Sequence, residues 1–215
     1  MMLSDIAGPT GLQQTWFALI GVLWLGYFFL EGFDFGVGTL LPFVSRDDLD
    51  RRQVINTIGP VWDGNEVWLL TAGGATFAAF PLWYATVFSG FYLALFLVLA
   101  ALIFRGMAFE IRSKRESVTW RKWWDRAIFI GSSLVALLWG VAFADFVHGV
   151  PLGANATWTG TFFDLVKPYA LLGGVTSLSL FTLHGATYLG LKTTGSVHER
   201  SRAIGLAIAP IATLS

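Results

Sequence analysis

Acidic residues recur in pairs inside two long apolar stretches of this sequence. Glu31 and Asp34 are three residues apart in the first stretch, and Asp63 and Glu66 repeat that spacing in the next. At about 100° per residue, this spacing places the two side chains of a pair roughly 60° apart on a helix, so they share one side. Charged groups inside a membrane-spanning helix are costly and typically mark ion or proton pathways. The pattern predicts two acid pairs on adjacent helices that meet.

Proton transfer is the chemistry that such carboxyls favour. A buried carboxyl without a fixed cation holds its proton, because desolvation disfavours the charged form. The apolar stretches carry no compensating set of buried cations, and the nearest are Arg105 and Arg112, toward the cytoplasmic end of the third stretch. Carboxyls in series would form a proton relay. Alternatively, they lie at helix ends and pair with loop arginines, and the residue types leave both interpretations open.

The other titratable residues point less clearly to chemistry. His184 is the one histidine within an apolar stretch. A haem or metal buried between helices needs a tighter set of ligands than this, so we expect no haem-binding and no metal-binding residue in this chain. Glu110, close to Arg112 and Lys114, is expected to form a structural ion pair. Asp145 is compatible with a pathway or with a solvated helix end.

The composition shows which elements must position these side chains. Of 215 residues, 55% are apolar and 13% are charged, with a mean hydropathy of +0.64. Soluble domains carry about 25% charged residues, so soluble and disordered classes are excluded. Basic and acidic residues balance at 14 each without a basic block, which argues against nucleic-acid binding. Cysteine is absent, which excludes disulfides and thiolate metal sites.

The apolar stretches have the length of membrane spans. A bilayer core about 30 Å thick needs roughly 20 helical residues. We therefore predict an all-α, polytopic transmembrane helical bundle forming one membrane domain, 1–215, with five complete spans and the start of a sixth: about 16–41, 61–80, 82–108, 127–147, 165–191 and 203–215 (partial). Because the last stretch is too short to span, we expect the N-terminal part of a longer subunit.

Basic residues and glycines add orientation and packing. Every Lys and Arg except Lys167 lies in or beside alternate connections, which predicts that these face the cytoplasm and that the N-terminus lies outside. Gly32 and Gly36 form a small-xxx-small face for close helix packing, and the pairs at 73–74 and 173–174 are expected to pack likewise or to mark local unwinding.

Tryptophan and tyrosine cluster at the ends of the predicted spans. An interfacial aromatic belt explains most of them. Trp62 and Trp68 differ because they flank the Asp63/Glu66 pair. These two side chains are therefore candidates for more than an interfacial role.

A series of sequence blocks is specific enough to indicate a family. They are GFDFGVG (32–38), GPVWDGNEVWL (59–69), TAGGATFAAFP (71–81), FRG (104–106), FEIRSK (109–114), WD (124–125) and HGATYL (184–189). In this order they closely resemble subunit II of the cytochrome bd quinol oxidase family, over nearly the whole chain. The family chain continues with further helices beyond the part that matches.

The resemblance implies a terminal oxidase complex of the bacterial plasma membrane. Such a complex oxidises quinol, reduces dioxygen to water and takes up protons from the cytoplasm. In this family subunit I ligates two b-type haems and one d-type haem and oxidises the quinol, and subunit II packs against it with a similar helical fold. The expected partners are therefore subunit I, membrane quinol and lipid, with small accessory subunits also compatible with the resemblance.

The resemblance also implies roles for individual residues. Asp63 matches the acid proposed to pass protons toward the haems, and Asp34 matches the acid of the GFD motif. Trp68 matches a tryptophan near a proposed oxygen path, so Trp68 and Trp62 are candidates for that path or for packing. The sequence departs from the family pattern at Glu66 and at His184, where family members can carry Gln.

Two other functions stay open at this point. Acids near the midplane and glycine-interrupted helices would suit a proton-coupled membrane transporter. A purely structural or assembly subunit would use the same acids only to pair with cations of subunit I. Haem content and turnover of an Asp63→Asn variant would separate assembly from proton relay.

Overall fold

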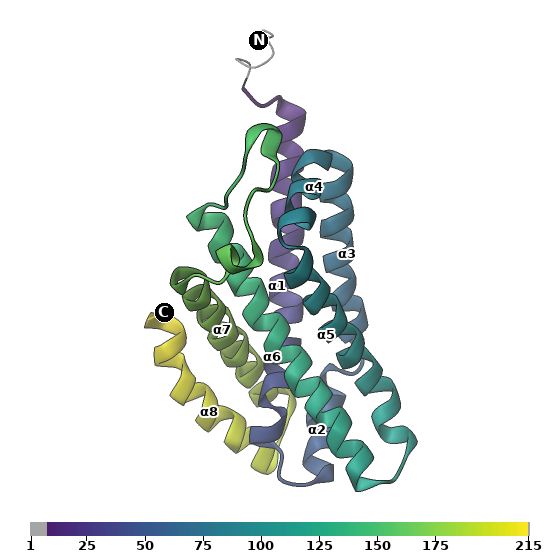
Figure 1. Ribbon diagram of the computed structural model, residues 1–215. Coiled ribbons are helices and arrows are strands. Elements are labelled where there is room, and N and C mark those ends of the chain that lie inside the picture. Colours follow the sequence, from purple (N-terminus) through teal and green to yellow (C-terminus); the bar gives the residue numbers. More distant parts are fainter. Residues whose placement is uncertain (1–7, 215) are drawn as a thin grey trace.

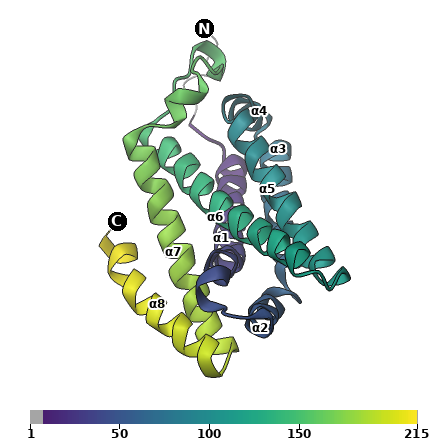
Figure 2. The ribbon, with the colours of Figure 1, turned by 60° about the horizontal axis from the view of Figure 1, so that its bottom comes forward.

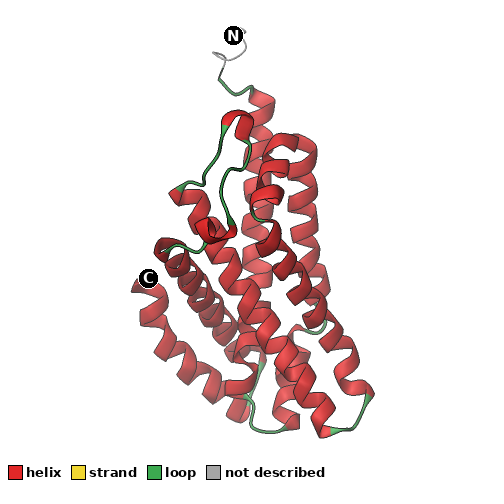
Figure 3. Cartoon of the chain, in the orientation of Figure 1, coloured by secondary structure: helices red, strands yellow, loops and turns green. Residues whose placement is uncertain are grey.

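Helices make up nearly all of the chain in the computed structural model, which describes residues 8–214 (Figure 3). The α-helices are α1 (Gly11–Val44), α2 (Asp48–Ile58), α3 (Trp62–Ala79), α4 (Pro81–Gly90), α5 (Tyr92–Ile111), α6 (Val118–His148), α7 (Pro168–Lys192) and α8 (Gly195–Leu214). Short 3-10 turns occupy Arg112–Lys114, Ala154–Ala156 and Phe162–Leu165. Within the described range the β-type pairing is limited to one bridge, Leu152 to Trp158. The predicted all-α class is confirmed.

Local sequence signals explain where several helices begin. Thr10 and Gln13 form a capping box at the start of α1. The side chain of Asp47 accepts a hydrogen bond from the backbone of Asp50 and caps α2. Pro81 and Pro168 stand at the first positions of α4 and α7, where a missing N–H costs nothing.

Among residues 8–214, three segments are long and apolar enough to cross a membrane: Gly11–Val44, Tyr92–Lys114 and Val118–His148. The predicted spans 61–80 and 165–191 correspond to α3 and α7. The partial span 203–215 lies in α8 except for Ser215, which is outside the described residues. The number of spans and the outward N-terminus, whose first seven residues are also outside that range, stay predictions.

Two expected boundaries differ in the structure. The predicted span 82–108 is not one helix, because the chain breaks at Phe91 between α4 and α5. At this break Gly90 lies under the ring of Trp158, where a Cβ would come within 2.3 Å of the ring, so the loop after α6 fills the break. Hydropathy does not reveal this break, since both flanks are apolar. In addition, residues 48–58 form the separate helix α2.

Helix α1 forms the centre of the bundle. It packs against α3, α6 and α7, while α5 packs on α6 and α8 lies along α7 (Figures 1 and 2). Gly36 of α1 meets Gly185 of α7 so closely that a Cβ on Gly36 would lie 1.9 Å from the carbonyl oxygen of Phe181. Gly173 and Gly174 pack against α6 in the same way. The packing role predicted for these glycines is confirmed, whereas a Cβ on Gly73 or Gly74 would meet nothing within 4 Å in the described chain.

Candidate functional site

Arg105 lies at the centre of the predicted acidic residues. Its side chain on α5 is fully buried, and Nη1 lies 3.2 Å from Glu31 Oε2 on α1 and 3.4 Å from Glu66 Oε2 on α3. The guanidinium carbon also lies 4.8 Å from the ring centre of Phe35 and 5.3 Å from that of Phe109. Arg105 thus joins three helices through charge and aromatic contacts.

The sequence prediction was wrong about the cation. It placed no compensating cation among the acids and assigned Arg105 to the cytoplasmic end of its span. Helix α5 instead continues to Ile111, which leaves Arg105 well inside the helix, against α1 and α3. A guanidinium buried to this degree requires carboxylate partners, since an unpaired buried charge is strongly disfavoured.

Asp34 has a different kind of partner. It is fully buried, and its Oδ2 accepts a hydrogen bond of 2.7 Å from Nδ2 of Asn65 on α3. In residues 8–214 no Lys or Arg side chain lies within 4 Å of its carboxylate. The amide of Asn65 was not singled out by the sequence, because pairing across 31 positions depends on how α1 and α3 are rotated against each other.

Several buried polar atoms around Arg105 have no hydrogen-bond partner within the described chain. Both carboxylate oxygens of Glu31, Asp34 Oδ1, Arg105 Nε and Nη2, and the hydroxyl of Ser132 on α6 are buried without a hydrogen-bond partner in the described chain. Buried polar groups in proteins are normally satisfied by protein or by ordered water. We call Glu31, Asp34, Asn65, Glu66 and Arg105 the inner acid cluster.

Asp63 does not join the inner acid cluster. It lies in the first turn of α3, is exposed, and its Oδ1 accepts a hydrogen bond of 2.8 Å from the backbone of Gly64. Among the described residues no cation pairs with it. Glu66, one turn on, is partly exposed, with 25% of its side chain accessible, and lies between Asp63 and Arg105. The structure therefore brings Glu31, Asp34 and Glu66 together. It leaves Asp63, the fourth predicted acid, near the solvent-exposed part of Glu66.

Trp62 and Trp68 flank this region through packing contacts. A Cβ on Gly26 of α1 would lie 2.4 Å from the ring of Trp68, so that ring rests on a glycine cradle. Trp62 lies against Gly106 of α5, and its ring centre is 5.1 Å from that of Phe109. Both rings fix α3 against its neighbours.

A second group of charges closes the bundle at the ends of α2 and α5. Arg112 pairs with Asp48 and with Asp125 of α6, Arg121 pairs with Asp48 at 2.9 Å, and Arg51 pairs with Asp125 at 3.4 Å. Burial alone would raise the pKa of Asp48, but the hydrogen bond and charge of Arg112, helped by Arg121, lower this pKa below its ordinary value. We call these five residues the outer ion-pair network.

Comparison with known proteins identifies the family. The model of the family described as cytochrome bd terminal oxidase subunit II matches residues 12–215. The chain is 50% identical over 207 residues to the probable cytochrome oxidase subunit 2 of Haemophilus influenzae, and 49% identical over 207 residues to the cytochrome bd-I ubiquinol oxidase subunit 2 of Escherichia coli strain K12. It is 47% identical over 191 residues to the cytochrome bd ubiquinol oxidase subunit 2 of Bacillus subtilis.

The chain belongs to the cytochrome bd terminal oxidase subunit II family. The matches cover 94%, 94% and 89% of this chain and 54%, 54% and 56% of the respective relatives. The chain thus spans about half the length of the curated relatives it matches.

The remaining candidates of this subunit II chain lie apart from the inner acid cluster. His184 on α7 packs against the rings of Phe29 and Phe33, at 5.6 Å from each ring centre. Glu110 is exposed, and the expected ion pair is wrong, since within residues 8–214 it pairs with no cation. Asp145 is buried near the end of α6, which excludes a solvated helix end.

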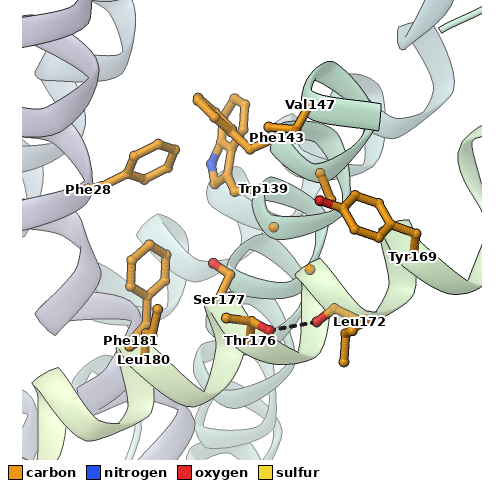
Figure 4. A pocket seen from close by; sticks show the side chains of 13 residues that line it. Phe28, Trp139, Phe143, Val147, Tyr169, Leu172, Thr176, Ser177, Leu180 and Phe181 are labelled. Carbon is orange, nitrogen blue, oxygen red and sulfur yellow. Dashed lines mark hydrogen bonds between the residues drawn. The ribbon is translucent and has the colours of Figure 1, made fainter. Parts of the chain in front are cut away.

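Among the described residues, no metal site adds to the cluster, and the main apolar groove is lined by other residues. In the part of the chain that the structure describes, no group of three or more His, Asp or Glu residues could hold a metal ion. An apolar groove with a volume of about 470 Å³ is lined by α6, α7 and α1. Trp139, Phe143 and Tyr169 are among its walls (Figure 4). None of the inner acid cluster lines it. That this chain ligates no haem and no metal stays a prediction.

Proposed function

We propose that this chain is a non-haem-ligating part of a quinol:oxygen oxidoreductase complex in a bacterial plasma membrane. In this role it takes up protons from the cytoplasm and conducts them toward a haem-bearing subunit I, which carries two b-type haems and one d-type haem. Family membership and the relatives named as ubiquinol oxidase subunit 2 support the complex. The inner acid cluster is the observation that supports the proton path.

The path runs from the exposed end of α3 into the bundle. Asp63 receives a proton at the surface, and the partly exposed Glu66 is one turn farther along the same helix. Glu66 and Glu31 both contact Arg105, and Asp34 lies one turn from Glu31 on α1. The unpartnered polar atoms among these residues suit bound water, which would bridge the gaps between carboxyls.

The same helix offers a surface for subunit I. Asp63, Val67, Leu70, Gly74 and Phe77 are exposed and recur at helical spacing on one face of α3. A Cβ on Gly74 would meet nothing within 4 Å among the described atoms, so another helix could approach closely there. We place subunit I on the apolar part of this face, which leaves Asp63 at its edge open to the cytoplasm. The tryptophans 62 and 68 behind it serve packing or an oxygen path.

Turnover of an Asp63→Asn variant tests the proton path. In the full-length protein within its complex, we expect this variant to retain the haem spectrum and to reduce oxygen more slowly, because Asn cannot carry a proton. Asp63→Glu should keep partial activity. Glu110→Gln, which neutralises an exposed acid on α5 outside the cluster, is the matched control and should turn over normally.

Two results would contradict the proposal. Wild-type turnover by Asp63→Asn from about pH 6 to about pH 9 would exclude Asp63 from a rate-determining proton path. Loss of haem together with activity would instead assign the acid to assembly of the complex. A substrate-dependent proton flux through this chain alone would favour a proton-coupled transporter.

A further inference from the structure

The inner acid cluster holds more carboxyls than cations. Glu31 and Glu66 both lie beside the guanidinium of Arg105, and Asp34 follows one turn after Glu31 on α1. If all were ionised, the cluster would carry two negative charges in excess in a largely buried site. A low-dielectric interior does not tolerate such an excess, so protons must be held within the group.

Among the described residues, no Lys or Arg other than Arg105 forms an ion pair with Glu31, Asp34 or Glu66. The other titratable groups facing this part of α1 are Tyr27 of α1 itself, Tyr188 of α7 and His184 of α7. The Nδ1 of His184 would lie 3.3 Å from a Cβ on Gly32, and its ring packs on Phe29 and Phe33. Asp63 acts on Glu66 from the same helix. On the far side α6 presents Gly131, whose Cβ would lie 3.1 Å from that of Arg105, and the uncharged Ser132. The charge balance among the described residues therefore depends on Arg105 alone.

Glu31 and Asp34 differ in what holds them. Glu31 is fully buried, and its Oε2 lies 3.2 Å from Arg105 Nη1, also fully buried. This geometry stabilises an ion pair, because each partner compensates the desolvation of the other. Asp34 has only the neutral amide of Asn65, at 2.7 Å from its Oδ2, while its Oδ1 is buried without a partner in the described chain.

An amide is suited to a carboxyl that changes protonation state. The Nδ2 of Asn65 donates to a carboxylate, and after rotation of the amide the carbonyl oxygen accepts from a carboxylic acid. The Asp34–Asn65 pair therefore stays hydrogen-bonded with or without the proton. The Glu31–Arg105 pair is held by charge alone, because the hydrogen bond of Arg105 Nη1 goes to Glu66 and neither oxygen of Glu31 has a hydrogen-bond partner in the described chain. Protonation of Glu31 would therefore remove its attraction to the guanidinium.

We propose that Arg105 is the positioning residue of the cluster, which fixes Glu31 as a carboxylate so that the exchangeable proton resides on the Asp34–Asn65 pair. A proton that arrives from Glu66 converts the Asp34 carboxylate into the acid, and its departure restores the carboxylate. The link of this proton to turnover rests on the proposed function, whereas its location does not.

Infrared spectroscopy of the full-length protein in its complex tests the location. We expect a carbonyl band from a protonated carboxyl that shifts in deuterated water, disappears in Asp34→Asn and persists in Glu31→Gln. Asp145→Asn is the matched control, because it removes a buried carboxyl of α6 outside the cluster. A band that persists in Asp34→Asn and disappears in Glu31→Gln would overturn the assignment.

Paired neutralisation tests the role of Arg105. Arg105→Gln leaves Glu31 buried without a counter-ion, and we expect the chain to accumulate in the membrane at a clearly lower level than wild type. Arg105→Gln combined with Glu31→Gln removes both charges and should restore accumulation, with the Asp34 band retained, and Arg105→Lys should retain both as well. A double variant that accumulates no better than Arg105→Gln would refute the counter-ion role.

These readouts separate the inference from the proposed function. Neither the infrared band nor the accumulation depends on turnover. Wild-type turnover by Asp63→Asn would overturn the proton path and leave the Asp34 band in place. A carbonyl band that persists in Asp34→Asn and disappears in Glu31→Gln would overturn the location of the proton. It would leave the slow turnover of Asp63→Asn intact.

Discussion

Arg105 and Arg112 are seven positions apart, and each is held by two carboxylates. The acids around Arg112 have second partners, because Asp48 also pairs with Arg121 and Asp125 also pairs with Arg51. The acids around Arg105 have none in residues 8–214. The outer ion-pair network is redundant, and the inner acid cluster depends on a single cation.

The difference extends to the sign of the excess charge. The outer network contains three cations and two acids, and the inner cluster contains one cation and three acids, of which Asp34 is hydrogen-bonded to Asn65. The outer network therefore needs no bound proton to balance its charge. The inner cluster does, which makes it the region where a proton can be loaded and released. Arg112, which follows directly after α5, thus serves structural stabilisation, and Arg105 within α5 serves the cluster that exchanges a proton.

Replacement of each arginine by Gln gives the largest expected contrast. Arg105→Gln leaves a buried carboxylate without a counter-ion and should destabilise the protein by about 3 to 5 kcal/mol. Arg112→Gln leaves each acid its second cation and should cost about 1 to 2 kcal/mol. Thermal unfolding in detergent, followed by tryptophan fluorescence, should rank wild type above Arg112→Gln and Arg112→Gln above Arg105→Gln. The reverse order would remove the distinction between the two regions.

The sequence predicted part of this arrangement. Spacing alone placed Glu31 and Asp34 on one side of α1 and indicated that they meet an acid of α3, because helical periodicity fixes relative direction within one helix. It could not separate Asp63 from Glu66. The roughly 60° between them is enough to turn one side chain toward solvent and the other toward Arg105, and that depends on the rotation of α3 in the bundle.

Arg105 and Asn65 show what the sequence could not supply. Hydropathy marks where an apolar stretch ends, but the helix continues past that point, so a cation near the predicted end became an interior one. Nothing in the sequence distinguishes Asn65 from other polar residues, because its pairing with Asp34 depends on how α1 and α3 pack together. By contrast, the glycines at positions 36, 173 and 174 were correctly predicted as packing residues. Glycine in a membrane helix indicates close helix packing by itself, because only a residue without a side chain lets two backbones approach so closely.

Removal of two cations together measures the redundancy of the outer network. Arg51→Gln alone leaves Asp125 paired with Arg112, and Arg112→Gln alone leaves it paired with Arg51. The double variant leaves Asp125 without a partner in the described chain. We expect the loss in unfolding free energy to exceed the sum of the single losses by about 0.5 to 2 kcal/mol. Additive losses in the same fluorescence measurement would show that the two pairs act independently.

The smallest expected effect on stability comes from protonation of Asp48 in acid. The pKa of this carboxyl in the folded protein is lowered below its ordinary value, mainly by Arg112 once burial is offset. A lowered pKa contributes stability above the ordinary value of about 3.9, and this contribution is lost as the pH falls through the folded value. Because 39% of the side chain is exposed, we expect less than about 1 kcal/mol.

Asp48→Asn should therefore weaken the dependence of unfolding temperature on pH below about pH 6. At neutral pH it should lower the stability only by the contribution of the lost ion pairs of Asp48. Unfolding temperatures measured from about pH 6 down to about pH 3 should fall less steeply in Asp48→Asn than in wild type. Glu110→Gln, an exposed acid outside both regions, should follow the wild-type slope. Parallel slopes for Asp48→Asn and wild type would show that this carboxylate gains nothing from its arginines, and that the outer network stabilises through Asp125 alone.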